Sequence, residues 1–338
     1  MKAYLSYLRI ISTFAVVILH VVAFYVLKFE EFPFKTWNIA HLIDSCIRFC
    51  VPVFLMISGA LLLDKDEKLE LFLTKRFKRI LVPFLFWSVI YFIYQNWGIS
   101  FTKNWKIISE NFYFELMKGV SFHFWYVYMI LGIYLFVPIL RRWTMKASNN
   151  ELLYFLGIWT ITLFINPENS NYFPKIEFLY FSKYIGYLVL GFYLSKLEIK
   201  SVAKTRIFSL LILFLGIFLT YFLTLQSTIE KGSFDKFFYE YLSPNVTITA
   251  IGIFIFFKTL TLKTNNFTIA IDKNTFGIYL IHLLILEIIK TQIPDSSFLG
   301  NQFFFFLYIM LISILVFLVS YLAIFTLSKI PFLKKIIT

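Results

Sequence analysis

The chain has 338 residues, of which 59% are hydrophobic, 21% aromatic and only 15% charged, whereas roughly 25% of the residues in an ordinary soluble domain are charged. This composition and a mean hydropathy of +0.77 exclude soluble, disordered and collagen-like classes. Two cysteines, Cys46 and Cys50, lie one helical turn apart in an apolar segment, so neither a disulfide framework nor a metal site is supported. We therefore predict an all-α, polytopic transmembrane helix bundle, with residues 1–338 forming a single integral membrane domain.

Ten segments are apolar and long enough to be drawn as transmembrane helices, which need about 20 mostly apolar residues. The first run begins at Tyr4 and is too long for a signal-peptide core, so we expect it to be retained as a helix. The fifth and ninth segments are the shortest. The predicted spans are 4–27, 39–63, 80–97, 121–140, 152–165, 178–195, 207–225, 243–260, 274–289 and 302–327.

The basic residues indicate which way the chain crosses the membrane. An even number of spans places both termini on one side. The loops on that side hold about 20 Lys and Arg residues, against about nine in the opposite loops, and such residues concentrate in cytoplasmic loops. We therefore expect both termini in the cytoplasm. The net charge of +13 follows from this topology and gives little reason to expect a nucleic-acid partner.

Arg9 and His20 both fall in the first predicted span, where an ionisable side chain is costly and is a functional candidate by default. They are about three helical turns and ~16 Å apart, so they project from nearly the same face at different depths. An imidazole suits general-base work near neutral pH, and a guanidinium suits phosphate. The alternative is an Arg9 that snorkels to the interface and a His20 that is structural.

Four further ionisable side chains fall within predicted spans: Asp44 and Arg48 in the second, and His282 and Glu287 in the ninth. The spacing of Asp44 and Arg48 at i and i+4 allows an ion pair, which is structural or orients a substrate. Arg48 is expected near the depth of His20. All four are candidates for an acceptor-side or a structural role.

Two groups of residues at the predicted membrane surfaces are also candidates. Arg76 and Arg79 lie three residues apart on one face of a helix at the inner side and could clamp the phosphates of coenzyme A, although a positive-inside anchor would look similar. His123, Trp125 and Tyr126 open the fourth span at the outer interface. Aromatic residues there commonly anchor a helix, and sugar rings also stack on them.

Five short motifs occur in order along nearly the whole chain. They are Arg9-x10-His20, Pro52-Val-Phe54 with Ser58-Gly59, Arg76-x-x-Arg79-Ile80 followed by Pro83 and Trp87, His123-Phe-Trp125-Tyr126 followed by Tyr134 and Pro138, and Phe276-Gly277-Ile-Tyr279-Leu-Ile-His282. Each motif is weak alone, but in this order they resemble the acyltransferase family 3 membrane proteins. Among these, the short chain looks most like the compact O-acetyltransferases of the enterobacterial common antigen type.

The resemblance implies an O-acetyltransferase that moves an acetyl or other short acyl group from cytosolic acyl-CoA to a hydroxyl of a surface or lipid-linked glycan. Carried over by motif, it implies His20 as the catalytic base or acyl relay. It implies that Arg9, Arg76 and Arg79 bind the donor. It implies acetyl-CoA as a substrate, with no permanently bound cofactor and no metal. The expected location is a bacterial cytoplasmic membrane, where the lipid bilayer, acyl-CoA and the glycan are the partners.

A transporter or flippase for a polysaccharide or lipid-linked sugar is the main alternative, because several spans with a few buried charges also suit a transport path. No pair of Gly- or Pro-broken helices is evident in corresponding halves of the sequence, which weakens this reading. A noncatalytic partner of a polysaccharide synthase is a third possibility. Acyl incorporation that depends on CoA distinguishes the enzyme from the transporter, and the effect of His20→Ala distinguishes it from the scaffold.

Overall fold

The computed structural model describes residues 2–96, 105–164, 183–293 and 301–337. No β-strand occurs within these ranges. The α-helices are α1 (Ala3–Val26), α2 (Phe34–Ile47), α3 (Cys50–Leu62), α4 (Leu69–Gln95), α5 (Trp105–Lys118), α6 (Trp125–Thr144), α7 (Asn149–Phe164), α8 (Ile185–Lys196), α9 (Val202–Lys231), α10 (Pro244–Lys258), α11 (Asn266–Gln292), α12 (Gln302–Leu327) and α13 (Pro331–Ile337). Two short 3-10 helices, η1 (Phe122–Phe124) and η4 (Phe237–Tyr239), precede α6 and α10.

Within the described ranges, eight segments are long and apolar enough to cross a membrane. Our count of ten is therefore not confirmed. The described parts of the predicted spans 152–165 and 178–195 correspond to α7 and α8, which have 16 and 12 residues and are shorter than a bilayer requires. Residues 165 and 178–182 of these spans lie outside the described residues. The predicted ninth span is, in contrast, part of the 27-residue α11. The eight segments are Ala3–Val26, Phe34–Leu62, Leu69–Gln95, Phe122–Thr144, Val202–Lys231, Phe237–Lys258, Asn266–Gln292 and Gln302–Leu327.

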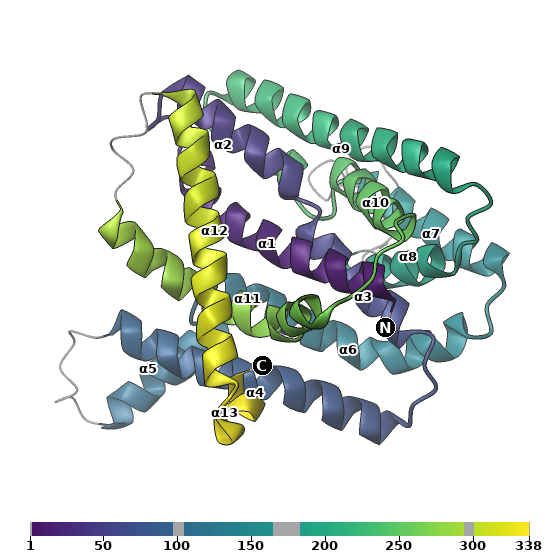
Figure 1. Cartoon of the computed structure of the whole chain (residues 1–338), viewed down its shortest axis with the longest axis horizontal. Helices are drawn as coiled ribbons and strands as arrows, with labels where there is room; N and C mark the ends of the chain where they lie inside the picture. The colour runs from purple at the N-terminus through teal and green to yellow at the C-terminus, as the bar shows by residue number, and fades with distance from the viewer. Residues whose placement is uncertain (1, 97–104, 165–182, 294–300, 338) are drawn as a thin grey trace, which may run out of the picture.

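Helix α1 is the central helix of the bundle. It contacts α2, α3, α10, α11 and α12 and runs through the middle of the molecule, between α9 at one edge and α4 at the other (Figure 1). A helix that is apolar on all sides is typically buried among others, and most α1 side chains are buried. The side chains of α1 are therefore positioned by neighbours on several sides.

The predicted second span is broken into α2 and α3 at Arg48 and Phe49. The break lies four residues before Pro52. A proline cannot donate a backbone hydrogen bond to the carbonyl four residues earlier, and its ring clashes with that carbonyl. Pro52 therefore explains why the helix is interrupted at Arg48, in the middle of an apolar run.

Helices α3 and α8 pack with their backbones in contact, and two glycines permit this. A Cβ atom on Gly59 would lie 1.9 Å from the carbonyl oxygen of Leu188, and one on Gly191 would lie 2.1 Å from that of Met56. Small residues allow such close helix contacts in membranes. This packing anchors α3, which lines the site described below.

Helix α9 has a narrow inward stripe of small residues. Its buried side chains are Ser209, Gly216, Thr220, Thr224 and Thr228, and the helix packs against α10, α2 and η4. Its exposed face carries large apolar side chains, among them Phe208, Phe214 and Phe218. The hydroxyls therefore lie towards the bundle and the phenylalanines lie outside it.

Candidate functional site

Three histidines from distant parts of the chain meet in the interior of the bundle. His20 comes from α1, His123 from η1 and His282 from α11. The ring centroids of His20 and His282 are 5.1 Å apart, those of His123 and His282 5.2 Å, and those of His20 and His123 6.2 Å. His123 and His282 are 1% and 0% exposed, whereas His20 is partly exposed towards a cavity.

Hydrogen bonds to carbonyl groups fix the proton positions of two of these rings. Nδ1 of His282 lies 2.6 Å from the carbonyl oxygen of Tyr279, and a carbonyl can only accept, so Nδ1–H donates and the lone pair is on Nε2. Nε2–H of His123 donates to the carbonyl of Leu280 at 3.4 Å, which leaves Nδ1 to accept from the Ser121 hydroxyl at 2.9 Å. His123 is therefore committed at both nitrogens.

Two imidazole nitrogens remain without a hydrogen-bond partner among the described residues. They are Nδ1 of His20 and Nε2 of His282, and both are buried. In the part of the chain that the structure describes, no group of three or more His, Cys, Asp or Glu side chains could hold a metal ion. An imidazole nitrogen can take up or release a proton near neutral pH, so the two unpartnered nitrogens suit proton transfer.

The cavity beside His20 is small, with a volume of about 30 Å³, and is walled mainly by aromatic and apolar side chains. Trp125 and Tyr241 line it with stacked rings, whose centroids are 5.9 Å apart at an angle of 20°. Tyr126 and Tyr279 also line it and contact each other edge to face. The full lining is Val16, Leu19, His20, Val51, Phe54, His123, Trp125, Tyr126, Tyr241 and Tyr279. Of the residues singled out from the sequence, His20, His123, Trp125 and Tyr126 thus line one cavity, and His282 contacts the His20 ring without lining it.

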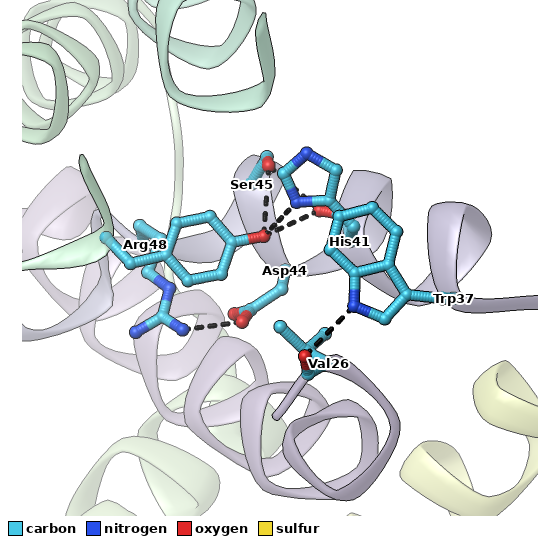
Figure 2. A network of polar contacts seen from close by, with 7 residues as sticks. Val26, Trp37, His41, Asp44, Ser45 and Arg48 are labelled. Atoms are coloured by element: carbon cyan, nitrogen blue, oxygen red, sulfur yellow. Dashed lines mark hydrogen bonds and ion pairs between the residues drawn. The ribbon is translucent and has the colours of Figure 1, made fainter. Parts of the chain in front are cut away.

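Asp44 and Arg48 form the ion pair that their spacing allows, with 2.5 Å between Oδ2 and Nη2 (Figure 2). Asp44 is fully buried, and the Arg48 guanidinium lies 4.1 Å from the centroid of the Tyr239 ring and 5.9 Å from that of Tyr241. Asp44 Oδ1 and Arg48 Nε are buried without a partner among the described residues. Tyr241 is thus shared between this pair and the cavity wall.

His41 was not singled out from the sequence, although it lies in the predicted second span. It is fully buried, with Nε2–H donating to the carbonyl of Tyr221 at 3.0 Å and Nδ1 accepting from the Tyr239 hydroxyl at 2.5 Å. The Ser45 hydroxyl donates to the His41 carbonyl and lies 3.3 Å from the same tyrosine oxygen (Figure 2). Both ring nitrogens of His41 make hydrogen bonds, and one of these bonds positions Tyr239, whose ring contacts the Arg48 guanidinium.

Arg9 is distant from the imidazoles, about 16 Å along α1 from His20. Its Nη1 lies 2.6 Å from Oδ1 of Asp272 on α11. The sequence prediction counted Asp272 among loop residues and missed this pair, because α11 begins earlier than the predicted ninth span. Glu287, further along α11, is exposed and lies outside the cavity lining.

Arg76 and Arg79 differ in their surroundings, although both lie on α4. Arg76 is half-buried, with Nη2 3.8 Å from a carboxylate oxygen of Glu67, while Arg79 is exposed. Lys75 Nζ lies 3.1 Å from the other oxygen of Glu67. This hydrogen bond lowers the pKa of the Glu67 carboxyl below its ordinary value. Glu67 is therefore ionised at neutral pH and already pairs with the predicted phosphate-binding helix.

Comparison with known proteins identifies the family. The acyltransferase domain of acyltransferase family 3 matches residues 2–325. The chain belongs to this family. It is also similar to proteins named "Probable poly-beta-1,6-N-acetyl-D-glucosamine export protein" from Staphylococcus aureus strains MSSA476 and N315, each 23% identical over 301 residues that cover 84% of this chain and 82% of the relative. No solved structure matches the chain. The family and the apolar helices together make it a multi-pass membrane acyltransferase.

Proposed function

We propose that this protein is an O-acyltransferase that moves an acetyl or other short acyl group from acyl-CoA to a hydroxyl of a surface or lipid-linked glycan. The observation that carries the proposal is the cavity that His20 and His123 line beside an aromatic wall, with the His282 ring packed against the His20 ring outside the lining. Trp125 is 40% exposed, so part of this aromatic wall is accessible to the face of a sugar ring. The family supports the transfer of an acyl group.

In this proposal His20 is the general base. An imidazole nitrogen removes the proton of the acceptor hydroxyl, the oxygen attacks the thioester carbonyl, and the departing thiolate takes up the proton. An alternative route transfers the acyl group first to His20 and then to the acceptor. In either route a ring nitrogen of His20 must carry a lone pair on the cavity side.

His282 is proposed as the residue that sets this tautomer. Its Nε2 lone pair is buried and unpartnered among the described residues, and so is Nδ1 of the adjacent His20 ring. A small rotation of the rings that brings Nδ1–H of His20 to Nε2 of His282 would satisfy both atoms and leave the His20 lone pair on Nε2. The second ring nitrogen of a catalytic histidine is commonly oriented in this way.

The donor is proposed to enter from the cytoplasmic side, where Arg9, Arg76 and Arg79 would attract its phosphates. We propose that both chain termini lie on the same side. The acceptor is proposed to approach His20 from the other side, past Arg48, Asp44 and the aromatic wall. The positive-inside bias of the loops supports this orientation. The identity of the acceptor, including the enterobacterial common antigen type, is a proposal that rests on sequence resemblance.

The test is transfer of radiolabel from acetyl-CoA to an alkali-labile glycan fraction in membranes. We expect His20→Ala to lower the rate by about 10²–10⁴-fold, since that is what a general base contributes. Gly132→Ala is the control, because no atom lies within 4 Å of a Cβ added there and Gly132 is outside the cavity lining; it should keep the wild-type rate, and both variants are compared at equal protein level. Equal labelling by wild type and His20→Ala would contradict the proposal.

Export of a polysaccharide is the second candidate function. The names of the Staphylococcus aureus relatives favour it, and so does the broken second span, because interrupted helices are common in transporters. A transporter moves glycan without incorporating acyl label. A strain that lacks the protein would lose surface glycan if the protein is an exporter. If His20→Ala restores that glycan without incorporating acyl radiolabel, export is favoured over acyl transfer.

A further inference from the structure

Two guanidinium groups flank one aromatic ring near the N-terminal end of α4. Arg76, on α4, lies 5.7 Å from the centroid of the Phe72 ring, and Arg141, near the C-terminal end of α6, lies 5.5 Å from it. Arg141 is only 5% exposed. Neither the sequence motifs nor the proposed function assigns a role to this second arginine.

The hydrogen-bonding capacity of the two arginines is only partly used. Arg141 Nη2 donates to the backbone carbonyl of Glu67. Arg141 Nη1 and Arg76 Nε are buried without a partner among the described residues. A buried N–H of a charged group that makes no hydrogen bond is unfavourable. These two atoms therefore indicate that an acceptor is missing beside Phe72.

Arg76 lines an open cavity, and Arg141 lies behind the cavity wall, where it is hydrogen-bonded to the backbone carbonyl of Glu67. Four cationic and two anionic side chains line it, together with Leu71: the cationic ones are Lys65, Lys68, Lys75 and Arg76, and the anionic ones are Asp66 and Glu67. One anionic group, Glu67, bridges Lys75 and Arg76 with its two carboxylate oxygens. A cavity with excess positive charge and a guanidinium in its wall suits a phosphate group. Displacement of Glu67 would open the way from this cavity to Arg141.

We propose that Arg76 and Arg141 are the two arms of a phosphate-monoester site, and that Glu67 is a resident counter-ion that gives way when phosphate binds. A phosphate monoester carries about −1.5 to −2 charge at pH 7 and three acceptor oxygens, whereas a carboxylate carries one charge, so the exchange is favourable. This inference rests on the proposed function, in which the phosphate belongs to the nucleotide part of the acyl donor. The alternative source of the same chemistry is the headgroup of an anionic lipid.

The experiment measures binding of adenosine 3′,5′-bisphosphate, which has phosphate monoesters but no thioester, to the full chain in phosphatidylcholine nanodiscs by calorimetry. We expect Arg141→Gln to weaken binding by at least about tenfold, the effect of losing a charge-assisted hydrogen bond. Arg141→Lys should recover only part of the affinity, because lysine lacks the planar fork. Arg142→Gln is the matched control, since Arg142 is the next residue and is exposed, and it should stay within about twofold of wild type.

Glu67→Gln tests the counter-ion independently of any arginine. We expect it to strengthen binding several-fold, because the phosphate no longer displaces a charge. Weaker binding by Glu67→Gln, or equal effects of Arg141→Gln and Arg142→Gln in proteins of unchanged thermal stability, would overturn the site. Because the nucleotide fragment carries no acyl group, loss of binding in Arg141→Gln supports the site even if no acceptor is ever acylated. If Arg141→Gln binds the nucleotide as tightly as wild type and still transfers acyl groups, the phosphate site is wrong and the proposed function is not.

A lipid arm separates the two sources of phosphate. If the site takes a lipid headgroup, wild type and Arg141→Gln bind the nucleotide equally in phosphatidylcholine discs. Native mass spectrometry then shows phosphatidic acid, whose headgroup is a phosphate monoester, retained by wild type and lost from Arg141→Gln. That result overturns the assignment to the donor. Nucleotide binding that depends on Arg141, without a difference in lipid retention, supports it.

Discussion

The imidazoles of His20 and His282 each leave one nitrogen buried without a partner among the described residues. Such an atom costs about 1–3 kcal/mol unless a ligand or a neighbour satisfies it. The rings are adjacent, so a hydrogen bond between them would remove both costs at once. His123 cannot take this role, because its two nitrogens are already committed to Ser121 and Leu280.

We therefore predict that His282→Phe lowers kcat for acyl transfer by about 10- to 100-fold, the usual effect of removing a group that orients a functional histidine. KM for the acyl donor should change by less than about twofold, because His282 orients the base and does not bind the donor. His282→Gln, which keeps a hydrogen-bond acceptor, should restore part of the rate. A raised KM with unchanged kcat in His282→Phe would indicate a substrate-binding role instead.

The sequence identified part of this site, and the limits have a physical cause. His20, Arg48, Asp44 and His282 could be found because ionisable groups are rare in apolar spans. The same signal was present at His41 and was overlooked. The contact of His20 with His282 and the approach of Arg141 to Phe72 depend on how separate helices pack. Residue spacing within one helix carries no information on that packing.

The interruption between α2 and α3 shows what hydropathy leaves out at the scale of an element. The segment 39–63 is mostly apolar, so hydropathy predicts one helix. Hydropathy reports whether a segment is compatible with lipid, whereas the break arises from a backbone hydrogen bond that Pro52 cannot make. Pro83 and Pro138 lie inside the continuous helices α4 and α6, so a proline alone does not predict where a helix is interrupted.

The contact between α3 and α8 gives a prediction about stability. Gly59→Ala should destabilise the protein by about 1–3 kcal/mol, as overpacking does, because its Cβ would overlap the backbone of Leu188. Gly132→Ala is the control, since no atom lies within 4 Å of a Cβ there, and alanine at this helical position should be neutral or stabilising. Thermal unfolding in detergent measures both. An equal midpoint for the two variants would contradict the packing described for α3.

At the scale of the whole molecule, the helical bundle was predictable from composition, but the number of spans was not. Segments near the length limit, such as α7 and α8, cannot be counted from apolar length alone, because neighbouring helices can shelter a short one. Eight or ten spans give the same prediction for the termini, since both numbers are even. Orientation therefore depends only on the distribution of charge.

We predict that single cysteines on either side of α10 react from opposite sides of the membrane. With Cys46 and Cys50 replaced by serine, Ser233→Cys should react with a membrane-impermeant maleimide in intact cells, and Thr264→Cys only after permeabilisation. Both positions are exposed, and the basic loops are expected inside. The opposite pattern would invert the proposed topology.

Helix α9 shows what the membrane changes about tolerance to mutation. Its hydroxyls and glycine lie towards α10, and its phenylalanines face outwards, the reverse of a helix on the surface of a water-soluble protein. On the outer face many apolar side chains of different shape are interchangeable, because lipid tails adapt to them. On the inner stripe a single added methyl group meets another helix, as a Cβ at Gly216 would meet Thr249 at 2.3 Å. Substitutions in α9 are therefore limited by side-chain volume on the inner stripe and by side-chain polarity on the outer face.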